Sequence, residues 1–443
     1  PVPGAGSFGC VLGLSPGGAY RHNDGLGPEL LCLPGARLLR NYGRISRTCV
    51  GAGAEVVQCG DVGCGTEGYR EDVRVELGPE TGTRGGAYAV RCAPEATVPE
   101  VAAGTAWRGK APACPVTVVC GGSRVASVPL LDASYVSEDV EIRGPTGEIA
   151  RATFLPGVRV CPGVGRILRS AVQGSVEILP GSDVTDSLLM EGCSVGPHSK
   201  IGSSVLGPDC HVSSGEITCC LLGEMSAAHH QSLLISVYAP TGRTNVGHGA
   251  DVGSNHTGRA ADQECVAGEG TFWGLGCAVK FPVDLSGMPY GLVAAGVALD
   301  PGQRITMPFS LLTTAGDRGT NRLHPGWILS DSPYSLERNG RKYGTRRTAR
   351  SHADYTAYNI IRPATVDLCA AARDDLRAAA PEQDGTRRVR GAGKNAVLSA
   401  DVEKGAAAYS EFVLRYALRS LLDEREGGEL RRRPAVGEEG PAP

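Results

Sequence analysis

The sequence predicts an all-β fold, a parallel β-helix with a helical appendage at its C-terminal end. Three observations predict it: a ladder of aliphatic residues, Gly and Pro between its rungs, and few aromatic residues. The ladder steps by five or six residues, a spacing that neither a helix (period 3.6) nor a strand (period 2) produces. Its rungs are Ile178, Val184, Met190, Val195, Ile201, Leu206, Val212, Ile217 and Leu222.

A repeat near six is typical of a β-helix built from hexapeptides. Each hexapeptide forms one short strand and one turn, three form a triangular coil, and the aliphatic residue points inward. The segments Leu179–Ser182, Val195–His198 and Leu206–Asp209 supply Gly and Pro for the corners. Gly accounts for 63 of 443 residues and aromatic residues for 5%, as a thin core requires. A Gly-rich β-sandwich is the alternative fold.

A second ladder precedes the first, with rungs at Leu33, Leu39, Ile45, Val50, Val56 and Val62. The period breaks near 66–112, which predicts an insertion. Past Leu312 the pattern gives way to basic and then amphipathic segments. The predicted organisation is a loop or cap over 1–30, the β-helix over 31–316, a basic helical segment packing on it over 317–379, a linker over 380–395, and an amphipathic helix with a tail over 396–443.

Charge and cysteine usage narrow the functional classes. The net charge of −3 gives no reason to propose nucleic acid or a membrane surface as partner. No apolar run reaches membrane-spanning length, and no signal peptide is visible at the start. The 16 cysteines show no paired CxxC set with zinc spacing. We therefore expect a cytoplasmic protein with reduced thiols.

The densest polar cluster lies after the main ladder, where four of the nine histidines fall between His229 and His256. Residues one coil apart, about 18, stack in a β-helix, so His230 and His248 are expected on the same side of adjacent coils. An exposed His is suited to act as a general base. The predicted catalytic residues are His230, His248 and His256, and the predicted substrate-binding residues are Asn245, Asn255, Arg259, Gln263 and Glu264.

Two other interpretations of this cluster stay open. The side chains can serve the fold alone, by bonding to loop backbone. Three histidines can also hold zinc, but the spacing differs from that of known three-histidine β-helix sites, and no metal is predicted.

The ladder resembles the hexapeptide-repeat, left-handed β-helix superfamily, which includes UDP-N-acetylglucosamine acyltransferases and the C-terminal domains of sugar-nucleotide pyrophosphorylases. A closer likeness, over most of residues 31–350, is to an uncharacterised family of long β-helix proteins. The stretches that carry this likeness are Asn41–Gly43, Glu80–Arg84, His229–Ile235, Gly253–Gly258 and Pro308–Leu311.

The resemblance implies a left-handed coil, a homotrimer, and acyl transfer to a sugar or nucleotide-sugar acceptor, with acyl-coenzyme A as a possible donor. In that scheme His256 or His248 deprotonates the acceptor, and Asn245, Asn255 and Arg259 orient it. The alternative function is a non-catalytic scaffold or sugar-nucleotide-binding module related to the pyrophosphorylases. A third is a nucleotidyltransferase-related protein, to which the segment Gly82–Gly86 bears a faint likeness.

Overall fold

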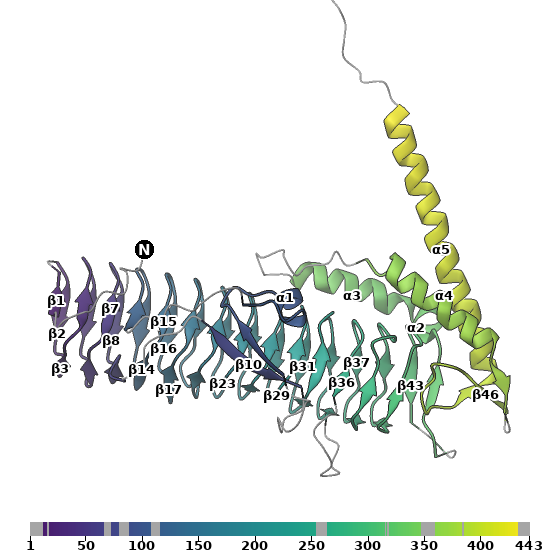
Figure 1. The fold of residues 1–443 in the computed structure, drawn as a ribbon, viewed down its shortest axis with the longest axis horizontal. Helices are drawn as coiled ribbons and strands as arrows, with labels where there is room; N and C mark the ends of the chain where they lie inside the picture. The colour runs from purple at the N-terminus through teal and green to yellow at the C-terminus, as the bar shows by residue number, and fades with distance from the viewer. Residues whose placement is uncertain are drawn as a thin grey trace, which may run out of the picture.

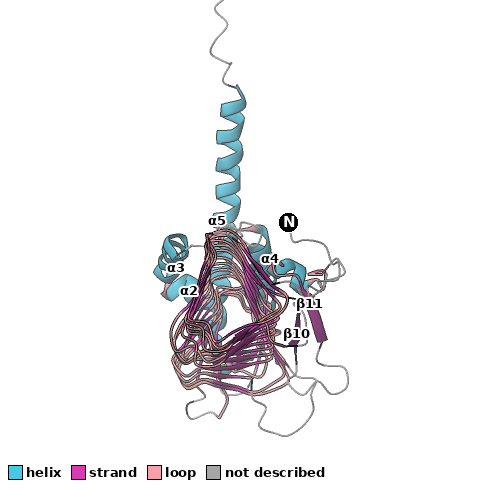
Figure 2. Ribbon diagram, turned by 90° about the vertical axis from the view of Figure 1, so that its left-hand side faces the viewer, coloured by secondary structure: helices cyan, strands magenta, loops and turns pink. Residues whose placement is uncertain are grey.

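The computed structural model describes residues 12–15, 17–65, 72–78, 88–107, 116–253, 264–314, 316, 319–346, 359–382 and 385–432. The chain winds into a long solenoid with three faces, each a sheet of parallel strands (Figures 1 and 2). We call the faces sheets A, B and C, of 14, 15 and 13 strands, in the order in which the chain passes through them. The predicted fold class, a β-helix with a helical appendage, is confirmed.

The strands are short in all three sheets. Sheet A contains β1 (Leu12–Leu14), β4 (Leu30–Cys32), β7 (Thr48–Val50), β12 (Thr117–Val119), β15 (Tyr135–Val136), β18 (Thr153–Phe154), β21 (Ala171–Val172), β24 (Leu188–Leu189), β27 (Val205–Leu206), β30 (Leu221–Leu222), β33 (Val237–Ala239), β36 (Cys265–Val266), β39 (Val283–Asp284) and β42 (Gln303–Arg304). Sheet B contains β2 (Ala19–Arg21), β5 (Arg37–Leu39), β8 (Glu55–Val57), β13 (Arg124–Ala126), β16 (Glu141–Arg143), β19 (Arg159–Val160), β22 (Glu177–Ile178), β25 (Ser194–Val195), β28 (His211–Ser213), β31 (Ala227–His229), β34 (Asn245–Val246), β37 (Phe272–Trp273), β40 (Leu292–Val293), β43 (Leu311–Thr313) and β44 (Arg322–His324). Sheet C contains β3 (Gly25–Leu26), β6 (Arg44–Ile45), β9 (Asp61–Val62), β14 (Leu130–Asp132), β17 (Glu148–Ala150), β20 (Ile167–Leu168), β23 (Asp183–Thr185), β26 (Lys200–Gly202), β29 (Glu216–Thr218), β32 (Leu233–Ile235), β35 (Asp251–Val252), β38 (Ala278–Val279) and β41 (Ala298–Leu299).

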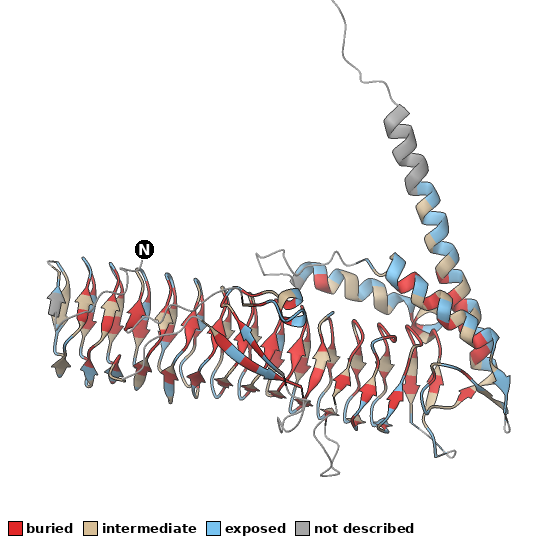
Figure 3. Ribbon diagram, in the orientation of Figure 1, coloured by how far each residue is buried: buried red, intermediate tan, exposed pale blue. Residues whose placement is uncertain are grey.

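Most rungs of the two aliphatic ladders form the core of the solenoid. Among the exceptions, Met190 packs under the hairpin on the outside of sheet A, and Leu33 is 41% exposed, whereas its neighbour Cys32 is buried in the core. Val184 pairs with Ile201, and Ile201 pairs with Ile217 on the next coil, so rungs of one face stack directly above one another. Ile201 is only 2% exposed. Because each rung packs against the rungs of the coils before and after it, burial is shared along the whole axis (Figure 3).

The corners between sheets turn sharply by using the left-handed backbone region at non-glycine residues. Arg169 at the corner between sheets C and A has φ 48°, and His230 at the corner between sheets B and C has φ 46°. Each corner is held by hydrogen bonds to the preceding coil: the N–H of Arg169 donates to the carbonyl of Ala150 at 2.9 Å. Side chains at equivalent corner positions therefore form columns along the solenoid.

The break in the period near 66–112 contains a hairpin and a short helix that cover the outside of sheet A. The hairpin strands β10 (Val73–Leu77) and β11 (Tyr88–Cys92) are antiparallel, and α1 (Val98–Ala102) follows them. A second apolar cluster joins Val75 and Leu77 of the hairpin to Leu188, Met190 and Val205 of sheet A. These strands are buried on both faces, so the insertion is firmly attached to the solenoid.

The C-terminal region packs on the end of the solenoid and along the side of its later coils (Figure 1). Its helices are α2 (Trp327–Asp331), α3 (Pro333–Arg346), α4 (Pro363–Arg377) and α5 (Ser399–Arg432), and a small sheet combines β45 (Ala380–Pro381), β46 (Thr386–Arg388) and β47 (Val397–Leu398). The first half of α5 contacts the last coil: the hydroxyl of Tyr409 donates to the carbonyl of Pro308 at 2.6 Å, and Phe412 lies against Phe309. The second half projects away from the body (Figure 1). No helix within the described ranges has the length and apolar character needed to cross a membrane.

A buried ion-pair network attaches these helices to the corner between sheets A and B. The guanidinium of Arg243 lies 2.5 Å from a carboxylate oxygen of Glu224 and 2.6 Å from one of Glu269. The guanidinium of Arg362, at the start of α4, contacts the other oxygen of Glu269. Tyr343 of α3 donates its hydroxyl to the carbonyl of Arg243 at 3.2 Å. Charges from consecutive coils thus neutralise one another beneath the helical layer.

Two predicted boundaries differ from the structure. The first coil begins before residue 31, because β1, β2 and β3 already pair in register with the strands of the next coil. The segment 380–395, predicted as a linker, contributes β45 and β46 and buries Val389 and Ala392. Its polar residues reach the last coil, where Lys394 donates from Nζ to the carbonyl of Pro301 at 2.6 Å. This charged segment therefore packs on the solenoid and does not separate two parts of the chain.

Candidate functional site

Histidines gather on sheet B and on the corner between sheets B and C. The register of the coils places β28, β31 and β34 side by side, which brings these side chains together. The rings of His211 and His229 are 5.5 Å apart between centroids, and those of His229 and His230 are 6.0 Å apart. We call this group, together with His248 on the following coil, the histidine column.

His248 has the geometry of a base. It is exposed, and its Nδ1 lies 2.8 Å from the carbonyl oxygen of His230, 18 residues earlier in the chain. A carbonyl oxygen only accepts, so the neutral ring carries its proton on Nδ1 and donates it to that oxygen. The other ring nitrogen, Nε2, then holds a lone pair that can accept a proton from a bound molecule.

The backbone around His248 is firmly held. Gly247 donates its N–H to the carbonyl of Trp273 at 2.8 Å, and Gly249 donates to the carbonyl of His230 at 3.1 Å. Gly249 has φ 65°, a conformation that glycine adopts without strain. Hydrogen bonds to the coil before and the coil after therefore fix the direction of the His248 side chain.

The other predicted site residues fall into three groups. His230 supplies its backbone carbonyl to His248, while its own side chain is exposed. Asn245 lies on β34 between Ala227 and Phe272, and its buried Oδ1 finds no hydrogen-bond partner among the described residues. Four more predicted residues, His256, Asn255, Arg259 and Gln263, lie outside the described residues.

Glu264 is not part of the histidine column. It precedes β36 in sheet A, at the corner between sheets C and A, and sheet C separates this corner from His248. Burial raises the pKa of the Glu264 carboxyl. Burial and the nearby Glu264 also raise the pKa of Tyr238. Glu264, predicted to bind substrate beside the histidines, therefore lies at a different edge of the solenoid from the histidine column.

A search of the described part of the chain for three or more His, Cys, Asp or Glu side chains able to hold a metal ion finds none.

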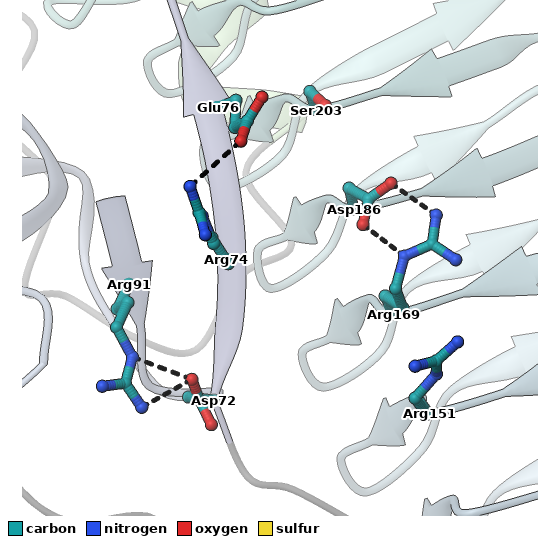
Figure 4. A pocket seen from close by; sticks show the side chains of 8 residues that line it. All are labelled: Asp72, Arg74, Glu76, Arg91, Arg151, Arg169, Asp186 and Ser203. Carbon is teal, nitrogen blue, oxygen red and sulfur yellow. Dashed lines mark hydrogen bonds and ion pairs between the residues drawn. The ribbon is translucent and has the colours of Figure 1, made fainter. Parts of the chain in front are cut away.

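A concavity, which the sequence did not reveal, lies at the corner between sheets C and A (Figure 4). Its volume is about 620 Å³, within the usual range for small-molecule sites. The hairpin strands β10 and β11 form one wall, and the column of corner side chains from Arg151 to Ser203 forms the other. The 18-residue spacing of Arg151 and Arg169, both at corners, is the sequence signal for one of these walls.

Comparisons with known proteins give limited matches. No family model matches the chain. An uncharacterised protein of Treponema pallidum (strain Nichols) is 24% identical over 155 residues, which is 34% of this chain and 21% of that protein. The chain thus matches about a fifth of that protein's length. A crystal structure from Desulfovibrio desulfuricans G20, of a protein provisionally named an acetyltransferase, covers 74% of this chain and 81% of that one. Its TM-score is 0.25 and its identity 8%, so the likeness carries no argument.

Proposed function

We propose that the protein is an acyltransferase that transfers an acyl group from a thioester, such as acyl-coenzyme A, to a hydroxyl or amino group of a sugar or nucleotide sugar. The resemblance of the repeat to hexapeptide transferases supplies the reaction class. The orientation of His248 supplies the base, and this is the observation that carries the proposal.

In this reaction Nε2 of His248 takes the proton of the acceptor O–H or N–H as the acceptor attacks the thioester carbonyl. A carbon–oxygen or carbon–nitrogen bond forms, the carbon–sulfur bond breaks, and the thiolate leaves with the proton returned by the imidazolium. The carbonyl of His230 stabilises the imidazolium because it accepts from Nδ1 in both protonation states. Asn245 lies in the strand that leads to His248 and has a buried acceptor oxygen.

The test is turnover with acetyl-coenzyme A and a panel of amino sugars and nucleotide sugars, followed by mass spectrometry of free coenzyme A. His248→Ala is expected to lower kcat by about 10²–10⁴, the usual contribution of a general base. His198→Ala is the matched control, because His198 occupies the same corner on an earlier coil with φ 59°. A wild-type protein without turnover, or an unchanged rate in His248→Ala, refutes the proposal.

A second candidate function is a binding scaffold. The projecting half of α5 exposes Leu414, Leu418 and Leu421 by 57%, 52% and 62%. These residues are spaced as on one side of a helix, the arrangement by which helices bind partners. Deleting the chain beyond Val413, which keeps Phe412 against Phe309, and measuring assembly by light scattering tests this function separately, because the histidine column lies on other coils.

A further inference from the structure

The cleft between the hairpin and the solenoid is strongly charged. Its lining includes four guanidinium groups and three carboxylates, an excess of one positive charge. On the solenoid wall, Arg169 binds Asp186 of the next coil through two hydrogen bonds of 2.6 and 2.7 Å. On the hairpin wall, Arg91 lies 2.8 Å from Asp72, and Arg74 lies 3.2 Å from Glu76. Each of these three pairs joins residues of the same wall, so each wall is rigid by itself.

The charges are unevenly distributed along the cleft. In Figure 4, Arg151 and Arg169 occupy one end of the solenoid wall, opposite Arg91, whereas Ser203 lies at the other end beside Glu76. Corner residues of adjacent coils are separated by about 4.8 Å, the spacing of strands in a sheet. The guanidinium groups of Arg151 and Arg169 can therefore reach the same tetrahedral anion. The opposite end offers a carboxylate and a hydroxyl, which are acceptors for O–H groups.

This polarity matches a ligand with an anionic group at one end and hydroxyls at the other. Arginine can bind phosphate with two parallel hydrogen bonds. Arg169 already binds Asp186 through Nε and one terminal nitrogen, so it would add hydrogen bonds from its remaining N–H groups to a phosphate held by Arg151. At the far end the Glu76 carboxylate contacts Arg74, and its oxygens together with the Ser203 hydroxyl can accept from hydroxyl donors. The cleft volume of about 620 Å³ accommodates such a molecule.

We propose that this cleft binds a phosphate monoester of a polyhydroxy compound, with its phosphate between Arg151 and Arg169 and its hydroxyls toward Glu76 and Ser203. The site is separate from the histidine column, because the two lie on different corners of the solenoid. It is a binding site independent of the proposed acyl transfer.

The test is isothermal titration calorimetry of the full chain at low ionic strength with glucose 6-phosphate, inorganic phosphate, gluconate and glucose. Glucose 6-phosphate is expected to bind most tightly, inorganic phosphate more weakly, and gluconate and glucose weakest. Arg151→Ala and Arg169→Ala are each expected to weaken glucose 6-phosphate binding at least about tenfold, the effect of losing a charge-assisted hydrogen bond. Glu76→Ala is expected to weaken binding of glucose 6-phosphate and to leave inorganic phosphate unaffected or bound more tightly.

Arg159→Ala is the matched control. Arg159 is exposed on sheet B between Arg151 and Arg169 in the chain, so its loss removes the same charge from another face. If Arg159→Ala weakened glucose 6-phosphate binding as much as Arg151→Ala does, the effect would be general electrostatic attraction. That result would overturn the proposal. Absence of binding, or gluconate binding as tightly as glucose 6-phosphate, would also overturn it. Far-ultraviolet circular dichroism of each variant verifies that the solenoid is intact.

Discussion

Arg243→Met tests whether the buried ion-pair network holds the C-terminal helices on the solenoid. The side chains of Arg243, Glu224 and Glu269 are 4%, 4% and 5% exposed, so all three charges are shielded from water. Without the guanidinium, Glu224 loses its ion pair, while Glu269 keeps that with Arg362. Removing one partner of a buried pair costs about 3–5 kcal/mol, because the other charge stays buried.

We expect a smaller loss of stability when an exposed ion pair is broken. Arg304 and Asp284 also lie on adjacent coils, 3.0 Å apart, but their side chains are 69% and 35% exposed. Arg304→Met is therefore expected to cost less than about 1 kcal/mol. Adding Glu224→Gln to Arg243→Met removes the buried negative charge and is expected to recover most of the loss.

Unfolding in guanidinium chloride, followed by tryptophan fluorescence, measures these differences in stability. Trp273 lies on β37, the strand that follows Glu269, and is fully buried. Hydrogen exchange of residues 237–246 shows whether the loss is local to this coil, since solenoid coils can open separately. Equal stability of Arg243→Met and Arg304→Met would refute the network as a source of stability. So would a double variant no more stable than the single one, because the penalty is assigned to the buried carboxylate.

Two further predictions concern the core. Ile201→Asp places an unpaired charge inside the prism and is expected to abolish the β-sheet signal in circular dichroism, whereas Lys200→Asp, on the exposed side of the same strand, should retain it. Burial raises the pKa of the Cys59 thiol to about 11 and that of Cys220 to about 12 from 9.0. Because these folded pKa values exceed the unfolded ones, the contribution of the protonated thiols is complete below pH 9 and lost as the pH rises toward 12. The melting temperature should fall over that range, with a shallower fall in Cys220→Ala, and an unchanged slope would contradict the assignment.

The solenoid was predictable because one inward rung per face and coil is a strong periodic signal. The segments that pack on the outside of the solenoid were harder to predict from the sequence. Leu188 and Leu189 are adjacent apolar residues of one strand, and both are fully buried, one under the hairpin and one in the core. Such pairs indicate strands covered on both faces, but they do not say what covers them. The segment 380–395 was mispredicted as a linker because its charged residues bind within the protein, as Lys394 does at the carbonyl of Pro301, and composition cannot distinguish this from solvation.

The candidate site was predictable only where the coil length is regular. His230 and His248 are 18 residues apart and lie on adjacent coils, as their spacing predicted. Glu264 follows a longer connection, for Val252 on sheet C pairs with Val279, 27 residues later. A separation other than 18 residues cannot be recognised from the spacing rule on which the stacking argument depends. The charged cleft could not be predicted from the repeat, because one of its walls comes from a segment outside the repeat.

The packing of α5 against the last coil has a consequence for self-assembly. A parallel solenoid ends in open strand edges, and such edges invite addition of further chains into fibres. Here the final strand of sheet B, β44, runs antiparallel to β43, with Leu323 opposite Leu312. Tyr409 and Phe412 cover the adjoining apolar surface. The helix covers part of this terminus, and we expect it to disfavour end-to-end growth there.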